Sequence, residues 1–465
     1  MTEKDFGRLS VGKIFLKLAI PNILSTLFAT AYIIADGIFV GHVIGQEALA
    51  AVNLLMPILS IIFALSDMIA VGASVKVATA LGEKKEEYAR NLFSSAIFTT
   101  IGIGFIVSIL SVFVLHPILF HLIKDQALAE LAFDYIKYFI YALPIIMPLY
   151  ALDNFLRISG KANLSMGINV IVSLLNIFLD WLFIVHFKAG IASAAFASII
   201  SMTIGAIASF MPFIRKKITL YFTKPKISKE DFIGIFYNGS SEFFGTTASS
   251  IIGIIANAIL LSLGGSLAVA SYSIVLYIDT FLIGTIYGIT DSMQPAISYN
   301  NGANYTVRVN KFYKLIRNVI VSISLLSFAA IIMFPEKLTL LFSNEEDREL
   351  IDLTIKALLM FAPSYIFTWF NRLSSEFLTA LDLPKESLII MGFETIVFPL
   401  ISLLILVPTL GVSGVFLAHS TSAALTMIIS FKIWNKSKDK YLSIDKVKKE
   451  TNINLLDKNL CKDCK

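Results

Sequence analysis

The sequence repeats itself once, and both copies are strongly apolar. The matching segments are 49–52 (LAAV) with 267–270 (LAVA), Gly82 with Gly302, and 190–198 (GIASAAFAS) with 411–419 (GVSGVFLAH). The offset stays near 218–221 residues throughout. A repeat of this length in an apolar chain predicts two parallel halves with the same internal fold.

Composition places this repeat in a membrane. The chain is 56% hydrophobic and 15% charged, and its mean hydropathy is +0.78. A soluble core does not hide that much apolar surface, whereas a bilayer does. Two parallel membrane halves are typical of alternating-access transporters. The chain lacks the phosphate-binding GxxxxGK[ST] motif and any nucleotide fingerprint, so we expect neither ATP-driven transport nor a cofactor.

Hydropathy predicts twelve spans, each of about 20 residues or more. They are 14–41, 49–80, 92–121, 133–156, 164–186, 190–213, 232–263, 267–299, 313–335, 355–380, 387–408 and 411–434. None shows the alternating period of a membrane barrel strand. We therefore expect an all-α integral membrane protein of twelve transmembrane helices in two six-helix bundles. No signal peptidase site follows the first span, so we expect that helix to be retained.

Lysine and arginine predict the orientation. They gather in alternate connections: the N-terminus, the loops after spans two, four and eight, the central connection and the tail. By the positive-inside rule these segments are cytoplasmic, and so are both termini. The predicted parts are an N-terminal bundle (1–213), a cytoplasmic linker (214–231), a C-terminal bundle (232–434) and a cytoplasmic tail (435–465).

The net charge of +5 is thus a topology signal, and no nucleic-acid motif accompanies it. The tail holds Cys461 and Cys464 as a single CxxC without two further zinc ligands nearby, so we interpret it as a reduced, inert pair. Four of the five histidines fall near predicted outer span ends. His419 lies inside the last span, where it suits a hydrogen bond between helices.

Ionisable residues inside spans cost several kcal/mol and are candidates for function. Asp36 lies deep in span one, and Asn176 and Asp180 lie in span five. A spacing of four puts the amide and the carboxylate on one helix face. Such a group of oxygens suits a proton or Na+. The structural alternative is an Asn–Asp pair that only holds helices together.

These residues carry a resemblance to a known family. Asp36 is followed by Phe39, Val40 and Gly41 and then by ALAAV (48–52). NIFLDWLFI (176–184) precedes GIASAAFAS, and QPAISYNNGA (294–303) begins the loop after span eight. Over residues 8–434 the chain resembles the multidrug and toxic compound extrusion (MATE) transporters, in particular their MepA-like branch.

The resemblance implies two six-helix bundles that form a V around a central cleft, and exchange of organic cations for H+ or Na+. It implies an ion or proton site made of Asp36, Asn176, Asp180 and the hydroxyl of Ser198, where the family commonly has threonine. Asn154 in span four is expected to join this network. If the coupling ion is Na+, Asp36, Asn176 and Asp180 are its expected ligands.

Substrate binding calls for a carboxylate and adaptable apolar or aromatic walls. Some members of the family carry an acid deeper in span seven, where this chain has Ser249 and Ser250. Glu242 lies about two turns away, so that role is not transferred to it. We still consider Glu242 a candidate for binding cations, against the alternative of a hydrogen bond to a neighbouring helix. The candidate wall residues are Met56, Tyr150 and Tyr272.

Other ionisable residues in the spans are weaker candidates. Like Glu242, three other acids in the spans are candidates for binding cations: Asp67, Asp279 and Asp291. Arg372 and Glu376 predict a local ion pair, and so do Asp153 and Arg157. Glu394, near the start of span eleven, is within reach of lipid headgroups.

The predicted function is a multidrug efflux antiporter in the cell membrane, a monomer in the lipid bilayer whose partners are small organic cations. One alternative is a lipid-linked oligosaccharide flippase of the same superfamily, which is expected to line its cavity with arginines. An intramembrane enzyme is disfavoured because DDxxD and HExxH are absent. A major facilitator is disfavoured because its Asp–Arg signature is missing from the loop after span two, which reads GEKKEEYAR.

Overall fold

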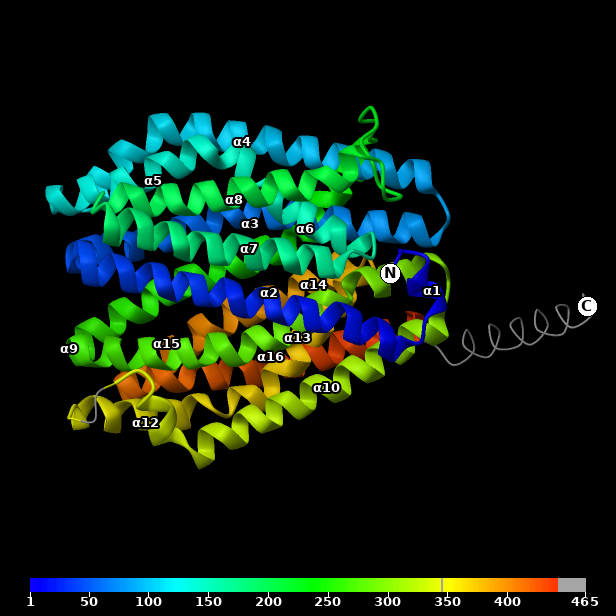
Figure 1. Ribbon diagram of the computed structural model, residues 1–465. Coiled ribbons are helices and arrows are strands. Elements are labelled where there is room, and N and C mark those ends of the chain that lie inside the picture. Colours follow the sequence, from blue (N-terminus) through cyan, green and yellow to red (C-terminus); the bar gives the residue numbers. More distant parts are fainter. Residues whose placement is uncertain (344–345, 442–465) are drawn as a thin grey trace, which may run out of the picture. The chain divides into compact units, whose positions relative to one another are not determined.

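The computed structural model describes residues 1–343 and 346–441, and every regular element in these residues is a helix (Figure 1). The elements of the first half are α1 Asp5–Arg8, α2 Val11–Phe39, η1 Val40–Ile44, α3 Gln46–Gly82, α4 Glu86–Leu122, α5 Gln126–Ile146, α6 Pro148–Ile158, α7 Ala162–Asp180, η2 Trp181–His186 and α8 Ile191–Ile214. Those that follow are α9 Lys229–Gly302, α10 Thr306–Met333, α11 Pro335–Thr339, α12 Arg348–Phe361, α13 Ser364–Ala380, α14 Pro384–Gly392, η3 Phe393–Val397, α15 Phe398–Leu410 and α16 Val412–Tyr441. The three η elements are π-helical turns.

The described helices account for twelve spans. Ten of them are long and apolar enough to cross a bilayer, and α12 and α13, bent by 49°, make an eleventh. The twelfth comes from α9, whose 74 residues would extend about 110 Å as one helix, far more than a bilayer requires. Gly265 has φ 63° and ψ −160°, so it divides α9 into two rods. The predicted all-α membrane fold is confirmed.

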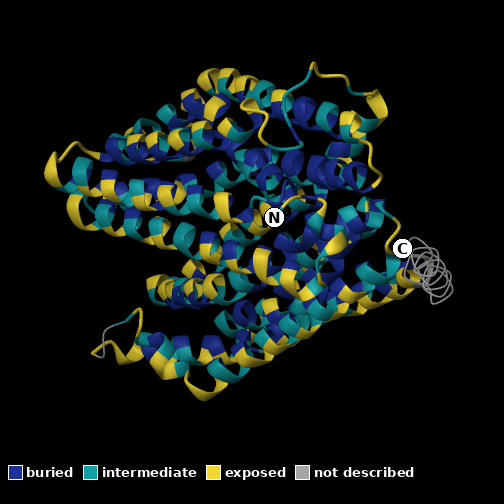
Figure 2. Ribbon diagram, turned by 45° about the vertical axis from the view of Figure 1, so that its right-hand side comes forward, coloured by how far each residue is buried: buried dark blue, intermediate teal, exposed yellow. Residues whose placement is uncertain are grey.

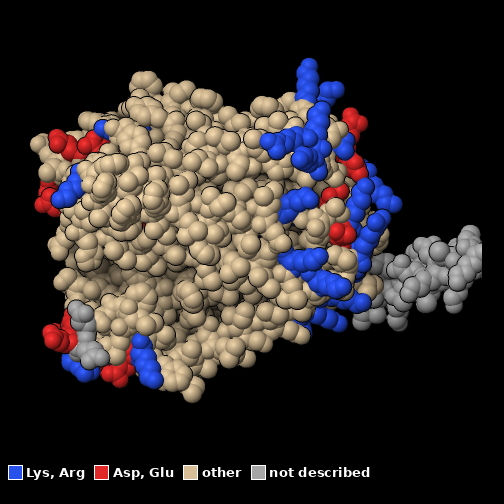
Figure 3. Space-filling view, in the orientation of Figure 1, with Lys and Arg blue, Asp and Glu red and all other residues tan. Residues whose placement is uncertain are grey.

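The outer faces of these helices suit lipid. Large apolar side chains are widely exposed, for example Phe113 on α4 and Leu404 on α15, and buried and exposed faces alternate along the helices (Figure 2). In the space-filling view, charged side chains gather at helix ends and leave an uncharged belt between them (Figure 3). This is the surface of a multi-pass membrane protein.

Left-handed residues mark the internal repeat in the backbone. The pairs with positive φ are Gly45 and Gly265, Lys84 and Asn304, Gly160 and Asp382, and Gly190 and Gly411. Each pair is separated by 220–222 residues, so the two halves break their helices at matching places. The repeat seen in the sequence is therefore a repeat of structure.

The chain divides into two compact units. Unit 1 comprises residues 1–3, 17–80 and 85–250, and unit 2 comprises 4–16, 81–84 and the described residues from 251 onward. The bundle, linker and tail boundaries expected from the sequence, with a linker at 214–231 and a tail at 435–465, stay predictions.

In unit 1, α5 packs on α4 and on α8, and α7 packs on α8 (Figure 1). The first part of α9 approaches α3 so closely that only glycine fits. A Cβ on Gly72 would lie 1.9 Å from the carbonyl oxygen of Ile235, and one on Gly239 would lie 1.7 Å from that of Met68. These two glycines fix the backbone contact between the helices.

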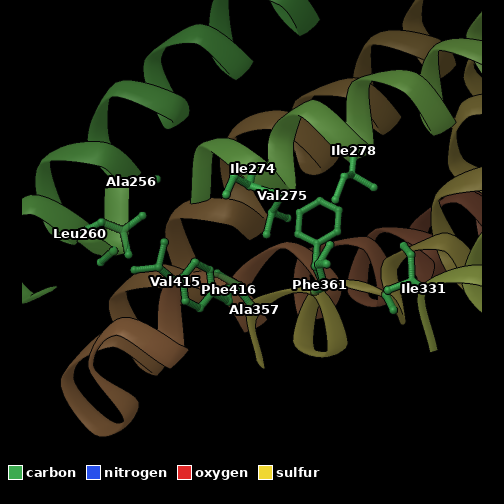
Figure 4. Close-up of a cluster of buried hydrophobic side chains, with 14 of the residues drawn as sticks. Ala256, Leu260, Ile274, Val275, Ile278, Ile331, Ala357, Phe361, Val415 and Phe416 are labelled. Carbon is green, nitrogen blue, oxygen red and sulfur yellow. The ribbon is translucent and has the colours of Figure 1, made fainter. Parts of the chain in front are cut away.

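Unit 2 is built around an apolar cluster. Ala256 and Leu260 from the first rod of α9 and Ile274, Val275 and Ile278 from the second belong to it, together with residues of α10, α12, α13, α15 and α16. Figure 4 shows Phe361 among these side chains. Tight packing of such side chains stabilises the unit without any charge.

Candidate functional site

Asp36 lies in the interior of unit 1, on a helix, α2, whose outer face is apolar. Its neighbours Ile33, Ile34 and Ile38 are exposed, whereas Asp36 is only 4% exposed. The π-helical turn η1 begins four residues later, and such turns are frequent at functional sites because they shift the helical register. Asp36 Oδ1 is buried and has no hydrogen-bond partner among the described residues.

Asp180 ends α7 in a similar setting. It is 0% exposed, and the π-helical turn η2 starts at the next residue. Its Oδ1 is likewise buried with no hydrogen-bond partner in the described part of the chain. Asp36 and Asp180 are close enough to interact electrostatically. Unit 1 therefore buries two neighbouring carboxyl groups, each with an oxygen that no described group satisfies.

Asn176 and Ser198 complete this group. The surrounding groups assign the Asn176 amide with its nitrogen toward Asp180. In this orientation the nitrogen donates to Asp180 Oδ2 at 3.2 Å, and the oxygen accepts from Ser198 Oγ at 3.0 Å and from the Ser198 backbone N–H at 3.2 Å. The spacing of four between Asn176 and Asp180 produces the first contact, as the sequence indicates. The structure thus brings together Asp36, Asn176, Asp180 and Ser198.

Two tyrosines belong to the same neighbourhood and were not singled out in the sequence. Tyr32 on α2 and Tyr135 on α5 are both close enough to interact electrostatically with Asp36 and Asp180. Tyr32 lies one helical turn before Asp36, and that spacing is a signal the sequence contains. Tyr135 comes from another helix, and nothing in its local sequence points to the site.

The predicted Asp153–Arg157 ion pair is confirmed, with Arg157 Nη2 2.7 Å from Asp153 Oδ2. The other carboxylate oxygen accepts hydrogen bonds from Ser165 and, at 2.9 Å, from Asn169 on α7. Arg157 Nη1 donates to Asn22 on α2. This polar network joins α2, α6 and α7.

Asn154 takes part in that network. Its side-chain oxygen accepts a hydrogen bond from Arg157 Nη2 at 2.9 Å, and its nitrogen donates to the Tyr150 carbonyl oxygen. Both of these hydrogen bonds are to residues of α6, and neither reaches Asp36 or Asp180. Membership of the ion site stays a prediction for this residue.

The candidate substrate residues lie in different parts of the chain. Met56, Tyr150 and Glu242 belong to unit 1 and are half-buried. The Tyr150 ring packs against Phe63 at 5.3 Å. Tyr272 belongs to unit 2, where its ring lies 6.3 Å from Phe416.

Unit 2 holds its own ionisable residues. The predicted Arg372–Glu376 pair is confirmed, with Nη2 3.0 Å from Oε1, and the same nitrogen also lies 3.1 Å from Asp291 Oδ1. Asp279 accepts a hydrogen bond from the Tyr365 hydroxyl at 2.7 Å. These contacts join distant parts of the sequence.

Two further predictions concern metal-binding residue types. His419 stacks on Phe361 with ring centroids 4.2 Å apart, so its ring contributes to packing between α16 and α12. Cys461 and Cys464 lie outside the described residues. Within the described ranges no group of three or more His, Cys, Asp or Glu side chains is arranged to hold a metal ion.

Comparison with known proteins agrees with this architecture. The sequence model of the MatE family matches residues 21–182 and again 243–404, once in each half. Among curated relatives, the multidrug export protein MepA of Staphylococcus haemolyticus (strain JCSC1435) is 24% identical over 456 residues, covering 95% of this chain and 97% of its own. MepA of Staphylococcus saprophyticus subsp. saprophyticus is 25% identical over 373 residues, covering 78% and 82%.

Solved structures show the same fold. One is the outward-facing conformation of a multidrug resistance MATE family transporter of the MOP superfamily, with a TM-score of 0.88 and 25% identity. Another is a MOP superfamily transporter from Pyrococcus furiosus, with a TM-score of 0.87 and 25% identity. Each match covers 94% of this chain and 98% of the other. The two family matches together span more than half of the sequence, and the chain belongs to the MatE family, whose members are transporters and not enzymes.

Proposed function

We propose that the protein is a multidrug efflux antiporter, which exports organic cations in exchange for H+ or Na+ by alternating access. Relatives at 24–25% identity over most of the chain are multidrug export proteins. We also propose that it is a monomer in the cell membrane with both termini in the cytoplasm. The coupling of export to H+ or Na+ is inferred from one observation, the buried pair Asp36 and Asp180.

Burial makes this pair sensitive to ions. A carboxylate in an apolar interior costs several kcal/mol unless a proton, a cation or hydrogen bonds neutralise it. Each of the two acids keeps one buried oxygen without a hydrogen-bond partner in the described residues. A proton on either oxygen removes the charge. Na+ would find carboxylate oxygens from both acids, whereas the amide oxygen of Asn176 faces Ser198 and would have to turn to become a ligand.

Coupling follows if the two conformations of the transporter differ in their access to this pair. A carboxylate that is open to water is stable as an anion, whereas a closed site favours the neutralised form. Binding of H+ or Na+ then shifts the population of conformations, and release on the other side resets it. Organic cations leave against their gradient while the coupling ion enters.

Transport into proteoliposomes tests the proposal, with ethidium as the substrate and with pH and Na+ gradients imposed independently. We expect one gradient to drive uphill ethidium movement in the wild-type protein. Asp36→Asn and Asp180→Asn keep the size of each side chain and remove its charge, so each should abolish uphill movement.

Asp134→Asn is the matched control. Asp134 is an acid on α5 in the same unit, and it forms a half-exposed ion pair with Lys137. Its loss should leave transport intact. Uphill export at the normal rate in either Asp36→Asn or Asp180→Asn would make that acid structural, and indifference of the wild-type protein to both gradients would refute antiport.

A further inference from the structure

Arg372 in unit 2 holds a buried positive charge between two acids. The side chain comes from α13, and its Nη2 lies 3.1 Å from Asp291 Oδ1 on α9 and 3.0 Å from Glu376 Oε1 on its own helix. Glu394 in η3 is also close enough to interact with it electrostatically. Three carboxyl groups thus surround one guanidinium group.

An aromatic ring faces the same guanidinium group. Arg372 Cζ lies 4.1 Å from the centroid of the Tyr287 ring. Tyr287 and Asp291 are one turn apart on α9, so the ring and the carboxylate are presented together. We call Tyr287, Asp291 and Glu376 the Arg372 cage. A ring face combined with carboxylates is the arrangement that binds organic cations, whose charge is delocalised or shielded by carbon.

The charged side chains of this group differ in exposure. The side chains of Arg372 and Glu376 are each 6% exposed, whereas that of Asp291 is 40% exposed. The Thr290 hydroxyl lies 3.1 Å from Asp291 Oδ1, and its single proton is shared among this carboxylate and the backbone carbonyl oxygens of Ile286 and Tyr287. A cation from solution therefore reaches Asp291 first.

We propose that Arg372 is an internal cation that occupies an organic-cation site, and that a substrate binds by displacing the guanidinium group from Tyr287 and Asp291. The inference rests on the proposed function for the substrate class, because it assumes that organic cations are carried. It adds the place of binding and the competitor. Arginine stays protonated at all physiological pH values, so the internal competitor keeps its charge.

Equilibrium binding of ethidium to the purified, full-length protein tests this competition. Removing the competitor in Arg372→Gln should tighten binding by about tenfold, as expected when a single charge pair no longer has to be broken. Asp291→Asn should weaken binding by a similar factor. Arg317→Gln is the matched control, because Arg317 lies 6.0 Å from the Tyr313 ring without forming part of this cage, and it should bind as the wild-type protein does.

A double variant shows whether tighter binding comes from removal of the guanidinium group or from the change in net charge. Arg372→Gln with Glu376→Gln removes one charge of each sign, so the net charge is unchanged and Glu376, the more deeply buried of the two acids that pair with Arg372, is not left as an unpaired anion. Binding should still tighten, by about threefold, because Tyr287 and Asp291 become available. The double variant also gives the result if Arg372→Gln does not fold.

Equal or weaker binding in both arginine variants would overturn the inference. That outcome differs from failure of the proposed function, in which the wild-type protein itself neither binds nor exports ethidium. Weaker ethidium binding in Asp291→Asn, together with tighter binding in both arginine variants, supports the Arg372 cage as the binding site.

Discussion

Asp36 and Ala256 occupy matching places in the two halves, each nine residues before a glycine with positive φ, Gly45 and Gly265. Asp36 is buried beside Asp180, whereas Ala256 is 2% exposed and packs in the apolar cluster of unit 2 (Figure 4). The same backbone position therefore holds a carboxyl group in one half and a methyl group in the other. The repeat preserves the breaks between helices and leaves the chemistry of the interior free to diverge.

A second pair of positions shows the same divergence. In unit 1, Ser165 donates a hydrogen bond to the Asp153 carboxylate. In unit 2, the residues 222 positions later are Ser387 and Ser375, whose hydroxyl oxygens lie 2.8 Å apart. The link between the two helices is kept, but a charged partner in one half is a neutral hydroxyl in the other.

An acid at position 256 of unit 2, the counterpart of Asp36, should change the free energy of unfolding more than any other substitution considered. Ala256→Asp buries a carboxyl group among apolar side chains, and we expect a loss of about 4–5 kcal/mol in the free energy of unfolding. Asp36→Ala should instead keep or raise stability while it removes ion coupling, because a buried unsatisfied group is lost. Thermal unfolding in detergent compares the two variants. Equal stability of Ala256→Asp and the wild-type protein would show that unit 2 accommodates the charge.

Much of this comparison could be predicted from the sequence. Apolar runs define the spans, because a bilayer requires about 20 such residues, and the repeated segments define the halves. Asn176 and Asp180 could be paired because their spacing of four is a local property of a helix. The sequence also indicated Asp36, since an acid in an apolar run is costly.

Contacts between distant helices could not be predicted. Nothing near Tyr135 in the sequence relates it to Asp36, and nothing near Asp291 relates it to Arg372, 81 residues away. Such contacts depend on how helices rotate about their axes and pack. The break of α9, by contrast, could be predicted, because Gly265 falls between the expected spans 232–263 and 267–299.

Breaking the charged link of unit 1 should cost more than breaking the neutral link of unit 2. Arg157→Ala leaves the largely buried Asp153 carboxylate, whose side chain is 16% exposed, without its ion-pair partner, and we expect a loss of about 3 kcal/mol. Ser375→Ala removes a neutral hydrogen bond to Ser387 and should cost about 1 kcal/mol. Thermal unfolding midpoints rank the two variants. The reverse order would mean that the ion pair of unit 1 is replaceable by solvent.

The smallest expected change in the free energy of unfolding concerns a backbone feature that both halves share, a glycine with positive φ before the sixth span of each half. Gly190 has φ 75° and Gly411 has φ 59°, and an added Cβ would meet no atom within 4 Å at either position. Substitution by alanine therefore tests backbone strain alone, and we expect Gly190→Ala and Gly411→Ala to cost about 1–2 kcal/mol each. Gly167 in α7 and Gly253 in α9 are controls within helices that also have free space, where alanine should stabilise by about 0.5–1 kcal/mol. If the costs at Gly190 and Gly411 differ by more than the difference between the controls, the two halves do not share the conformational constraint that their matching φ values indicate.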